Sequence, residues 1–204
     1  MGIFYVNHTV RASQDRVLDI LKKERRTAFV SPTIGGYTVV CDRQCDEQDP
    51  VAIAQLGQKL SALLGAPVLA VLNHDDDLFS YWLFKQGQLI EEHDAFPENV
   101  EDDDEGFGGF RLYRETEEDW NPTPEDDEAS ATPGEELCRI LGHEAMGEQV
   151  QAVLTGCDAL FARQIHQELV ELLGLPSCAV GAGYKCVIQR HTELDRDECV
   201  HVGS

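Results

Sequence analysis

The sequence has few basic residues, with 16 lysines and arginines against 38 aspartates and glutamates, for a formal net charge of −22. Nucleic acids and anionic membranes repel such a chain unless it presents a basic face, so we expect neither a direct nucleic-acid partner nor a membrane partner. One basic cluster stands out, formed by Lys22, Lys23, Arg25 and Arg26. It falls at the end of a predicted helix, where positive charge complements the helix dipole.

Long apolar runs are also missing. No window approaches 18 apolar residues, which argues against a membrane span, and residues 1–13 lack the basic flank and apolar run of a signal peptide. The seven cysteines are an odd number without the spacing of a disulfide framework, which is typical of reduced thiols. These features predict a cytoplasmic protein.

Motifs for common catalytic and cofactor sites are absent as well. There is no Gly-x-Ser-x-Gly, and Gly181-Ala182-Gly183 stands between two predicted strands, which indicates a hairpin turn rather than a phosphate-binding loop. The close pairs Cys41/Cys45 and Cys199/His201 do not provide two tight ligand pairs of structural-zinc spacing. The sequence therefore leans away from an enzyme and predicts no cofactor.

What the chain does have is a concentrated acidic stretch at 91–128. It holds 17 acidic residues against two arginines, which accounts for 15 of the 22 net negative charges. Charge of this density repels itself, so we expect it to face water, a cation or a basic partner.

Aromatic residues lie within the same stretch, although purely solvating acidic segments contain few of them. Acid interleaved with aromatics is typical of segments that dock on a basic, partly apolar surface, with rings as anchors and charge as steering. A lid lying back on the domain would explain the same rings. The predicted partner-binding residues are Asp102, Asp103, Asp104, Glu105, Phe107, Phe110, Tyr113, Glu117, Glu118, Asp119 and Trp120.

The carboxylates at 101–105 also suggest calcium or magnesium, which take hard oxygen ligands. With Gly106 at the sixth position of an EF-hand loop, Glu101, Asp103 and Glu105 occupy ligand positions. Leu112 then stands where the loop requires a bidentate glutamate, so the EF-hand pattern fails. A looser cation site built on these three residues is the alternative.

A second polar cluster lies between two predicted core strands. His74, Asp75 and Asp77 occupy the connecting turn, and Tyr81 and Trp82 follow in the next strand. Loops on a rigid sheet often carry function, which makes these five residues a candidate pocket. The plainer interpretation is a polar turn that keeps two apolar strands in solution.

For the fold, we predict an α+β protein with a mixed, mainly antiparallel sheet flanked by helices. Expected helices include 14–25, one after Asp49-Pro50 with Ile53, Leu56, Leu60 and Leu63 on its core face, and 158–173 with Phe161, Ile165, Leu169 and Leu172 on its core face. Expected strands include 68–72, 78–84, 178–180 and 184–188, followed by a fraying polar tail from 189.

An internal echo supports two related halves. Residues 55–71 align without a gap to 164–180, with nine identities that include Leu60/Leu169, Gly65/Gly174 and Pro67/Pro176. This predicts a repeated helix–strand unit, unless the same helix stop arose twice. We divide the chain into an α+β portion at 1–96, an acidic loop or linker at 97–132, and a helical portion with a C-terminal strand pair at 133–204, packed with 1–96 as one domain.

Together these observations predict a non-enzymatic acidic interaction module of bacterial type that binds a basic protein partner, as an inhibitor, immunity or adaptor protein does. The alternatives are a divalent-cation-binding protein using the loop carboxylates, an enzyme with an unrecognised site at 74–77, and a DNA-mimicking inhibitor. The last requires charge along an extended face, whereas this charge sits in one segment.

Overall fold

The computed structural model describes residues 2–95, 132–155, 159 and 161–203. The described elements, in chain order, are β1 (Tyr5–Val10), α1 (Gln14–Lys23), β2 (Ala28–Val30), β3 (Thr38–Asp42), α2 (Pro50–Leu64), β4 (Val68–His74), β5 (Leu78–Lys85), β6 (Gln88–Ala95), α3 (Glu135–Leu141), α4 (Gly147–Thr155), α5 (Ala162–Leu172), α6 (Tyr184–Gln189) and β7 (Val200–Val202). No helix in this part of the chain combines the length and apolar character that a membrane crossing requires.

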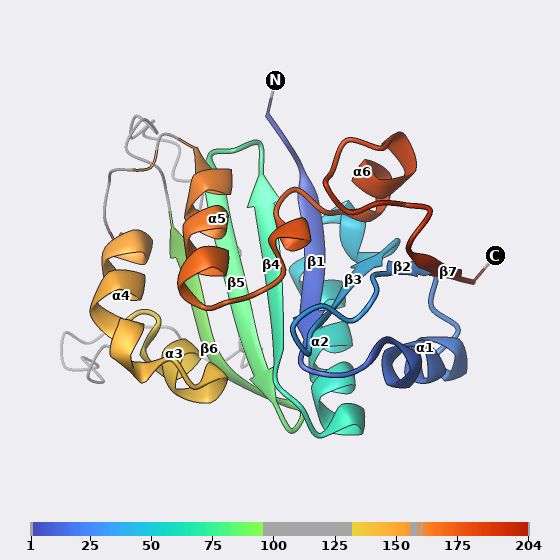
Figure 1. The fold of residues 1–204 in the computed structure, drawn as a ribbon, viewed down its shortest axis with the longest axis horizontal. Helices are drawn as coiled ribbons and strands as arrows, with labels where there is room; N and C mark the ends of the chain where they lie inside the picture. Colours follow the sequence, from blue (N-terminus) through green and yellow to red (C-terminus); the bar gives the residue numbers. More distant parts are fainter. Residues whose placement is uncertain (1, 96–131, 156–158, 160, 204) are drawn as a thin grey trace, which may run out of the picture.

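A seven-stranded sheet forms the centre of the molecule, in the order β6-β5-β4-β1-β3-β2-β7 (Figure 1). Every neighbouring pair in it is antiparallel. All six residues of β1 are buried, as are the first seven of β5, because helices cover both faces of the central strands. The α+β prediction is confirmed, and the described sheet is antiparallel throughout.

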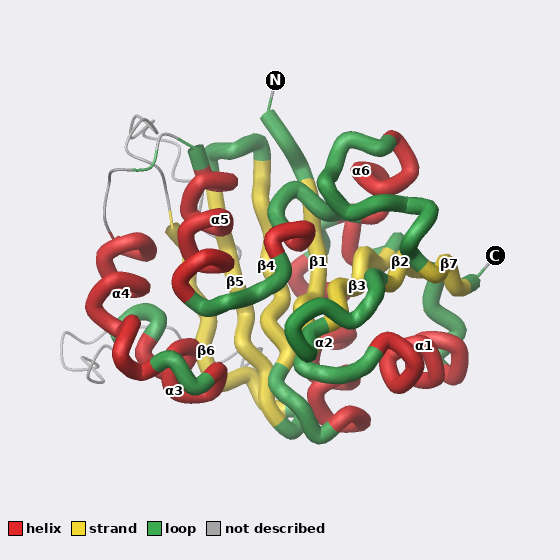
Figure 2. Tube along the Cα trace, in the orientation of Figure 1, coloured by secondary structure: helices red, strands yellow, loops and turns green. Residues whose placement is uncertain are grey.

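The two faces of the sheet bury separate cores. Alternate residues of β1 show the division, because Val6 packs in the core beneath α1 and α2 whereas Tyr5 packs in the core beneath α3, α4 and α5. A third, smaller core under α6 includes Phe29 and Val187. Figure 1 shows α5 in front of the sheet and α2 behind it, and Figure 2 shows helices on both sides of the strands.

Helix α2 begins and ends at the predicted signals. The Asp49 side chain accepts a hydrogen bond from the Val51 amide at 3.0 Å, and Gly65 ends the helix with a left-handed φ of 61°. One face residue was predicted wrongly, because Leu63 is 56% exposed and Leu64 takes the buried position. Phe161 is likewise 54% exposed instead of facing the core.

The internal repeat, residues 55–71 with 164–180, has the same structure only as far as the glycine that ends each helix. Gly174 has a φ of 59°, close to that of Gly65, but the residues after Pro176 form a 3₁₀ turn at Ser177–Ala179 where β4 follows Pro67. The predicted strand at 178–180 is therefore wrong, and so is the repeated strand of the unit.

The predicted strand at 184–188 is also wrong, because these residues belong to α6. The Asp46 carboxylate accepts hydrogen bonds from the Tyr184 amide at 2.8 Å and the Lys185 amide at 3.2 Å, which satisfies the first turn of this helix. Gly183 precedes it where an added Cβ would lie 2.9 Å from the Tyr5 Cβ. The glycine run thus leads into a helix whose start is already occupied by a carboxylate of the chain.

The polar tail does not fray. Its residues Val200–Val202 form β7, which pairs with β2 in the register Phe29 with His201. The predicted C-terminal strand pair is thus replaced by a 3₁₀ turn and α6, and a single strand of the main sheet follows. Residues from both ends of the chain consequently share one sheet, while the proposed boundaries at 96–97 and 132–133 stay predictions.

Candidate functional site

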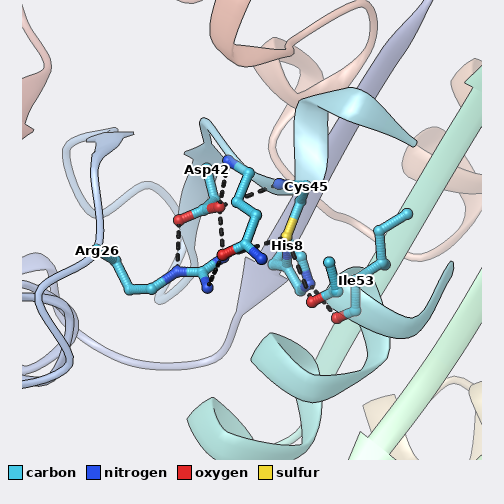
Figure 3. A network of polar contacts seen from close by, with 7 residues as sticks. His8, Arg26, Asp42, Cys45 and Ile53 are labelled. Atoms are coloured by element: carbon cyan, nitrogen blue, oxygen red, sulfur yellow. Dashed lines mark hydrogen bonds and ion pairs between the residues drawn. The ribbon is translucent and has the colours of Figure 1, made fainter. Parts of the chain in front are cut away.

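A buried ion pair lies where β3 ends. The Asp42 side chain is 1% exposed and accepts two hydrogen bonds from the Arg26 guanidinium, from Nε at 2.9 Å and from Nη2 at 2.5 Å (Figure 3). Arg26 follows α1, which ends at Lys23, so its role is to pair with this carboxylate rather than to complement the helix dipole. Burial alone would lower the pKa of Arg26, but the bonded carboxylate raises it.

Two further titratable groups adjoin this pair. The Asp42 Oδ1 accepts the Cys45 amide at 3.1 Å, and the Cys45 thiol lies 3.6 Å from both the Arg26 Nη2 and the Ala52 carbonyl oxygen. The His8 imidazole donates from Nε2 to the Ile53 carbonyl oxygen at 3.0 Å, and its buried Nδ1 has no hydrogen-bond partner among the described residues. In Figure 3 these side chains converge between the end of β3 and the first turn of α2.

The surroundings make this network unreactive. Burial raises the pKa of the Cys45 thiol, and the nearby Asp42 charge raises it further, so the thiolate is disfavoured. Burial also lowers the pKa of His8 to about 4, which keeps its imidazole neutral at pH 7. We therefore assign the network a structural role, joining β1, β3 and α2.

A second buried histidine lies on the opposite face of the sheet. The Tyr5 hydroxyl is 2.9 Å from His166 Nδ1, and the His166 ring stacks on Phe79 with ring centroids 5.5 Å apart. Burial lowers the pKa of His166 to about 3. Both histidines are therefore buried in their neutral form when the chain folds.

This arrangement predicts a loss of stability as the pH falls. A base whose folded pKa lies below its unfolded value of 6.5 contributes its full stability above pH 6.5 and loses it as the pH falls toward the folded pKa. At about 1.4 kcal/mol per pKa unit, His8 contributes on the order of 3 kcal/mol. Urea unfolding between pH 7 and 4 measures how steeply the free energy of unfolding depends on pH. We expect His8→Gln to reduce this slope, because the glutamine amide keeps a donor for the Ile53 carbonyl and does not titrate.

The exposed His191 provides the matched control. His191→Gln should show the same dependence of the unfolding free energy on pH as the parent chain. An identical slope in His8→Gln and the parent chain would show that His8 does not contribute to the pH dependence of stability.

The predicted polar cluster at 74–77 forms the turn between β4 and β5. The Asp77 amide donates to the His74 carbonyl oxygen at 3.0 Å, and His74 Nδ1 is 2.6 Å from the Gln48 Oε1. Asp75 and Asp76 adopt left-handed φ angles of 52° and 62°. The turn is thus held by its own backbone and by a neighbouring side chain, with Asp75 and Asp77 exposed.

The aromatics predicted to line the same pocket point away from each other. Tyr81 and Trp82 are each 1% exposed, in the cores on opposite faces of β5. Three surface hollows lie elsewhere: about 610 Å³ beside α2 near Leu63, about 290 Å³ over Arg26 and Asp42, and about 330 Å³ beside β7. His74 lines none of these three, and the pocket at this turn stays a prediction.

One glutamate joins the two elements on either side of residues 97–132, here called the acidic insertion, which connects β6 to α3. The Glu91 carboxylate on β6 accepts hydrogen bonds from the Tyr81 hydroxyl at 3.0 Å, the Gly134 amide at 2.5 Å and the Leu137 amide at 2.7 Å. It thereby caps the start of α3 and ties that helix to the sheet. This carboxylate is the first acid of the stretch at 91–128, and it serves the fold instead of facing water.

The residues expected to contact a partner or a cation lie outside the described residues. These are the anchors Phe107, Phe110, Tyr113 and Trp120, the acids at 102–105 and 117–119, and Glu101 with Asp103 and Glu105 as cation ligands. Within the described ranges, no three His, Cys, Asp or Glu side chains are placed to hold one metal ion.

The sequence interpretation did not single out His8, Asp42 or Glu91. A signal was present for Asp42, because strand alternation places it on the same buried face as Val40 and a buried carboxylate requires a partner. The basic cluster that contains Arg26 offered a positively charged partner nearby in the sequence. His8 and Glu91 gave no comparable signal, since His8 bonds to a distant backbone carbonyl and Glu91 accepts from two distant backbone amides as well as from Tyr81.

The chain was also compared with known proteins. No protein-family model, no curated protein and no solved structure matches it.

Proposed function

We propose that this protein is a non-enzymatic interaction module that binds a basic protein partner through its acidic insertion. The observation that carries the proposal is the position of that insertion. It leaves the sheet after β6 and rejoins at α3, and the Glu91 carboxylate holds both elements together. The most acidic part of the chain is therefore mounted on a rigid core whose two faces are already covered by helices.

The state of the described reactive groups also favours binding over catalysis. Burial raises the pKa values of the Cys41, Cys45, Cys138 and Cys186 thiols, and raises that of Cys199 to about 12. Thiols of raised pKa are poor nucleophiles because little thiolate is present near pH 7. The buried histidines His8 and His166 are enclosed by core contacts.

The basic character of the partner follows from the charge. Residues 97–132 hold 14 acidic residues against two arginines, and these twelve net negative charges steer a cationic surface toward the insertion and repel an anionic one. Exposed charges are screened over about 8–10 Å at physiological ionic strength, so binding should weaken as salt rises.

The test is an affinity capture from the native host's lysate at low salt, with the full chain beside two variants of equal charge. One removes four negative charges from the insertion by Asp102→Asn, Asp103→Asn, Asp104→Asn and Glu105→Gln. The other neutralises four exposed acids elsewhere, by Asp19→Asn, Glu168→Gln, Glu193→Gln and Glu198→Gln. We expect a stoichiometric basic protein that the parent and the second variant capture, that the first variant loses, and that salt elutes.

Equal capture by both variants would show that total charge, and not the insertion, selects the bound proteins. The proposal would then be wrong, because a net charge of this size attracts cations without specificity.

A further inference from the structure

The hollow of about 290 Å³ over the Arg26–Asp42 ion pair, here called the arginine hollow, brings three arginines together. Arg25, Arg26 and Arg43 all line it. The two segments that carry them are joined by their backbones, because the Arg43 amide donates to the Thr27 carbonyl oxygen at 2.8 Å, next to the pairing of β2 with β3. The hollow is therefore attached to the central sheet and does not depend on a long loop.

The two carboxylates that line the arginine hollow already have partners. Asp42 accepts hydrogen bonds from the Arg26 guanidinium and from the Gln44 amide (Figure 3). Glu47 accepts one from the Lys185 ammonium at 3.1 Å. Both negative charges are thus matched by a cation other than Arg25 or Arg43.

Arg25 adopts a backbone conformation that favours glycine. Its φ is 54°, and it follows the end of α1, where the Arg26 amide donates to the Leu21 carbonyl oxygen at 2.9 Å. Helices α2 and α3 end with Gly65 and Gly142 in the same left-handed conformation, which a residue with a Cβ adopts only at a cost. Strain of this kind is found where a side chain serves a function, so the arginine at position 25 points to a role for its guanidinium.

Arg25 and Arg43 are both exposed, and neither side chain forms an ion pair with a residue that the structure describes. Arg190 provides the contrast, because it also has a left-handed φ, 58°, yet its guanidinium binds the Asp197 carboxylate at 2.9 Å. Two positive charges of the arginine hollow are therefore uncompensated, in a chain whose net charge is −22. An anion from outside the chain can take the place that Asp197 has beside Arg190.

The chemistry of the hollow selects a small dianion. Guanidinium groups present planar forks of N–H donors that match the oxygens of phosphate and carboxylate, and two uncompensated forks match a double charge better than a single one. A phosphate monoester carries a charge of about −1.5 to −2 at pH 7 and three acceptor oxygens. A polyanion fits less well, because the net charge of the chain repels it along its whole length.

We propose that Arg25 and Arg43 bind a phosphate group in the arginine hollow, supplied by inorganic phosphate or by a small phosphate monoester. The volume of about 290 Å³ lies below the range of about 300–1,000 Å³ typical of sites for drug-sized ligands, so an ester that fits has few atoms besides its phosphate. This site is independent of the proposed function, since it binds an anion whereas the acidic insertion attracts a cationic protein.

The test is an NMR titration of the full chain at constant ionic strength with inorganic phosphate, with glycerol 3-phosphate and with glycerate, a carboxylate of similar size. We expect both phosphates to shift the amide signals of Thr27, Arg43 and Gln44 and to bind at least about fivefold more tightly than glycerate. Tighter binding of glycerol 3-phosphate than of inorganic phosphate identifies an ester as the ligand, and equal binding identifies the free anion.

A double variant and a control of equal charge test the two arginines. Arg25→Gly with Arg43→Met should lose the shifts and lower the affinity for phosphate about tenfold. Arg11→Met with Arg163→Met removes two exposed arginines that do not line the hollow, and it should keep the affinity within about twofold.

Arg25→Gly alone guards against loss of folding. Glycine adopts the left-handed conformation without strain, so this variant should unfold at a higher urea concentration than the parent chain while binding phosphate more weakly. A lower unfolding midpoint with unchanged phosphate affinity would show that Arg25 serves the fold alone, and the proposal would be wrong.

Three further results would overturn the phosphate site. Equal losses of affinity in the two double variants would show that total charge, and not the hollow, attracts the anion. Glycerate that binds as tightly as the phosphates would remove the selection for a dianion. Titration up to 10-fold-screened millimolar concentrations is not required, because absence of shifts at Thr27, Arg43 and Gln44 in the titration above is sufficient to reject the site.

Discussion

Replacing Arg26 with methionine is expected to lower the free energy of unfolding by about 3–5 kcal/mol, because it leaves a buried carboxylate without its countercharge. The Asp42 side chain is only 1% exposed, and Arg26 supplies two of its hydrogen bonds. The Gln44 and Cys45 amides would still donate to Asp42 Oδ1, but two neutral donors do not replace a guanidinium. Urea unfolding at pH 7 gives the measurement.

Two further variants give this prediction its controls. Arg43→Met removes an exposed arginine near the same carboxylate and should change the unfolding free energy by less than about 0.5 kcal/mol. Adding Asp42→Asn to Arg26→Met should restore part of the loss, because the amide oxygen still accepts the two backbone donors and no charge is buried. A double variant that is less stable than Arg26→Met would show that the carboxylate does not need its partner.

Leu169→Ala is expected to cost about 2–5 kcal/mol. Leu169 is 2% exposed and lies on the face of α5 that packs against the sheet, in the core that includes Phe79 and Leu137. Removing its side chain leaves a cavity that the surrounding strands and helices cannot fill without moving. Thermal or urea unfolding of the two chains measures the difference.

Leu63→Ala provides the comparison in α2, the helix whose sequence aligns with that of α5. Leu63 is 56% exposed on α2, so the same truncation should change stability by no more than about 0.5 kcal/mol. If the two truncations cost the same, the exposed position would have to be buried in solution, and the assignment of the α2 face would be wrong.

The predictions that held depended on local patterns with few alternatives. The apolar run of β5 is buried on both faces, and Asp49-Pro50 and Gly65 mark the ends of α2 as expected. The face of α2 was harder, because positions 53, 56, 60 and 63 fit helical spacing as well as positions 53, 56, 60 and 64 do. With about 3.6 residues per turn, only packing against the sheet distinguishes them.

The predictions that failed depended on contacts distant in sequence. The segment after Gly183 reads as a strand from its valine and isoleucine, but Asp46 satisfies its first two amides and a helix forms. The tail reads as polar, but β2 offers it an edge to pair with. The buried network at Asp42 likewise needs Arg26 and His8 from other elements, and a single sequence does not show which of its charges meet.

The position of β7 has a consequence for biosynthesis. Strand β2 is made near the beginning of the described chain, and its outer neighbour β7 is made after every other strand of the sheet. A nascent chain therefore carries β2 with one unpaired row of backbone groups until the last strand emerges from the ribosome. Exposed edges of this kind invite pairing with other chains, so slow translation of the segment that contains β7 would lengthen the period in which the nascent chain is prone to aggregate.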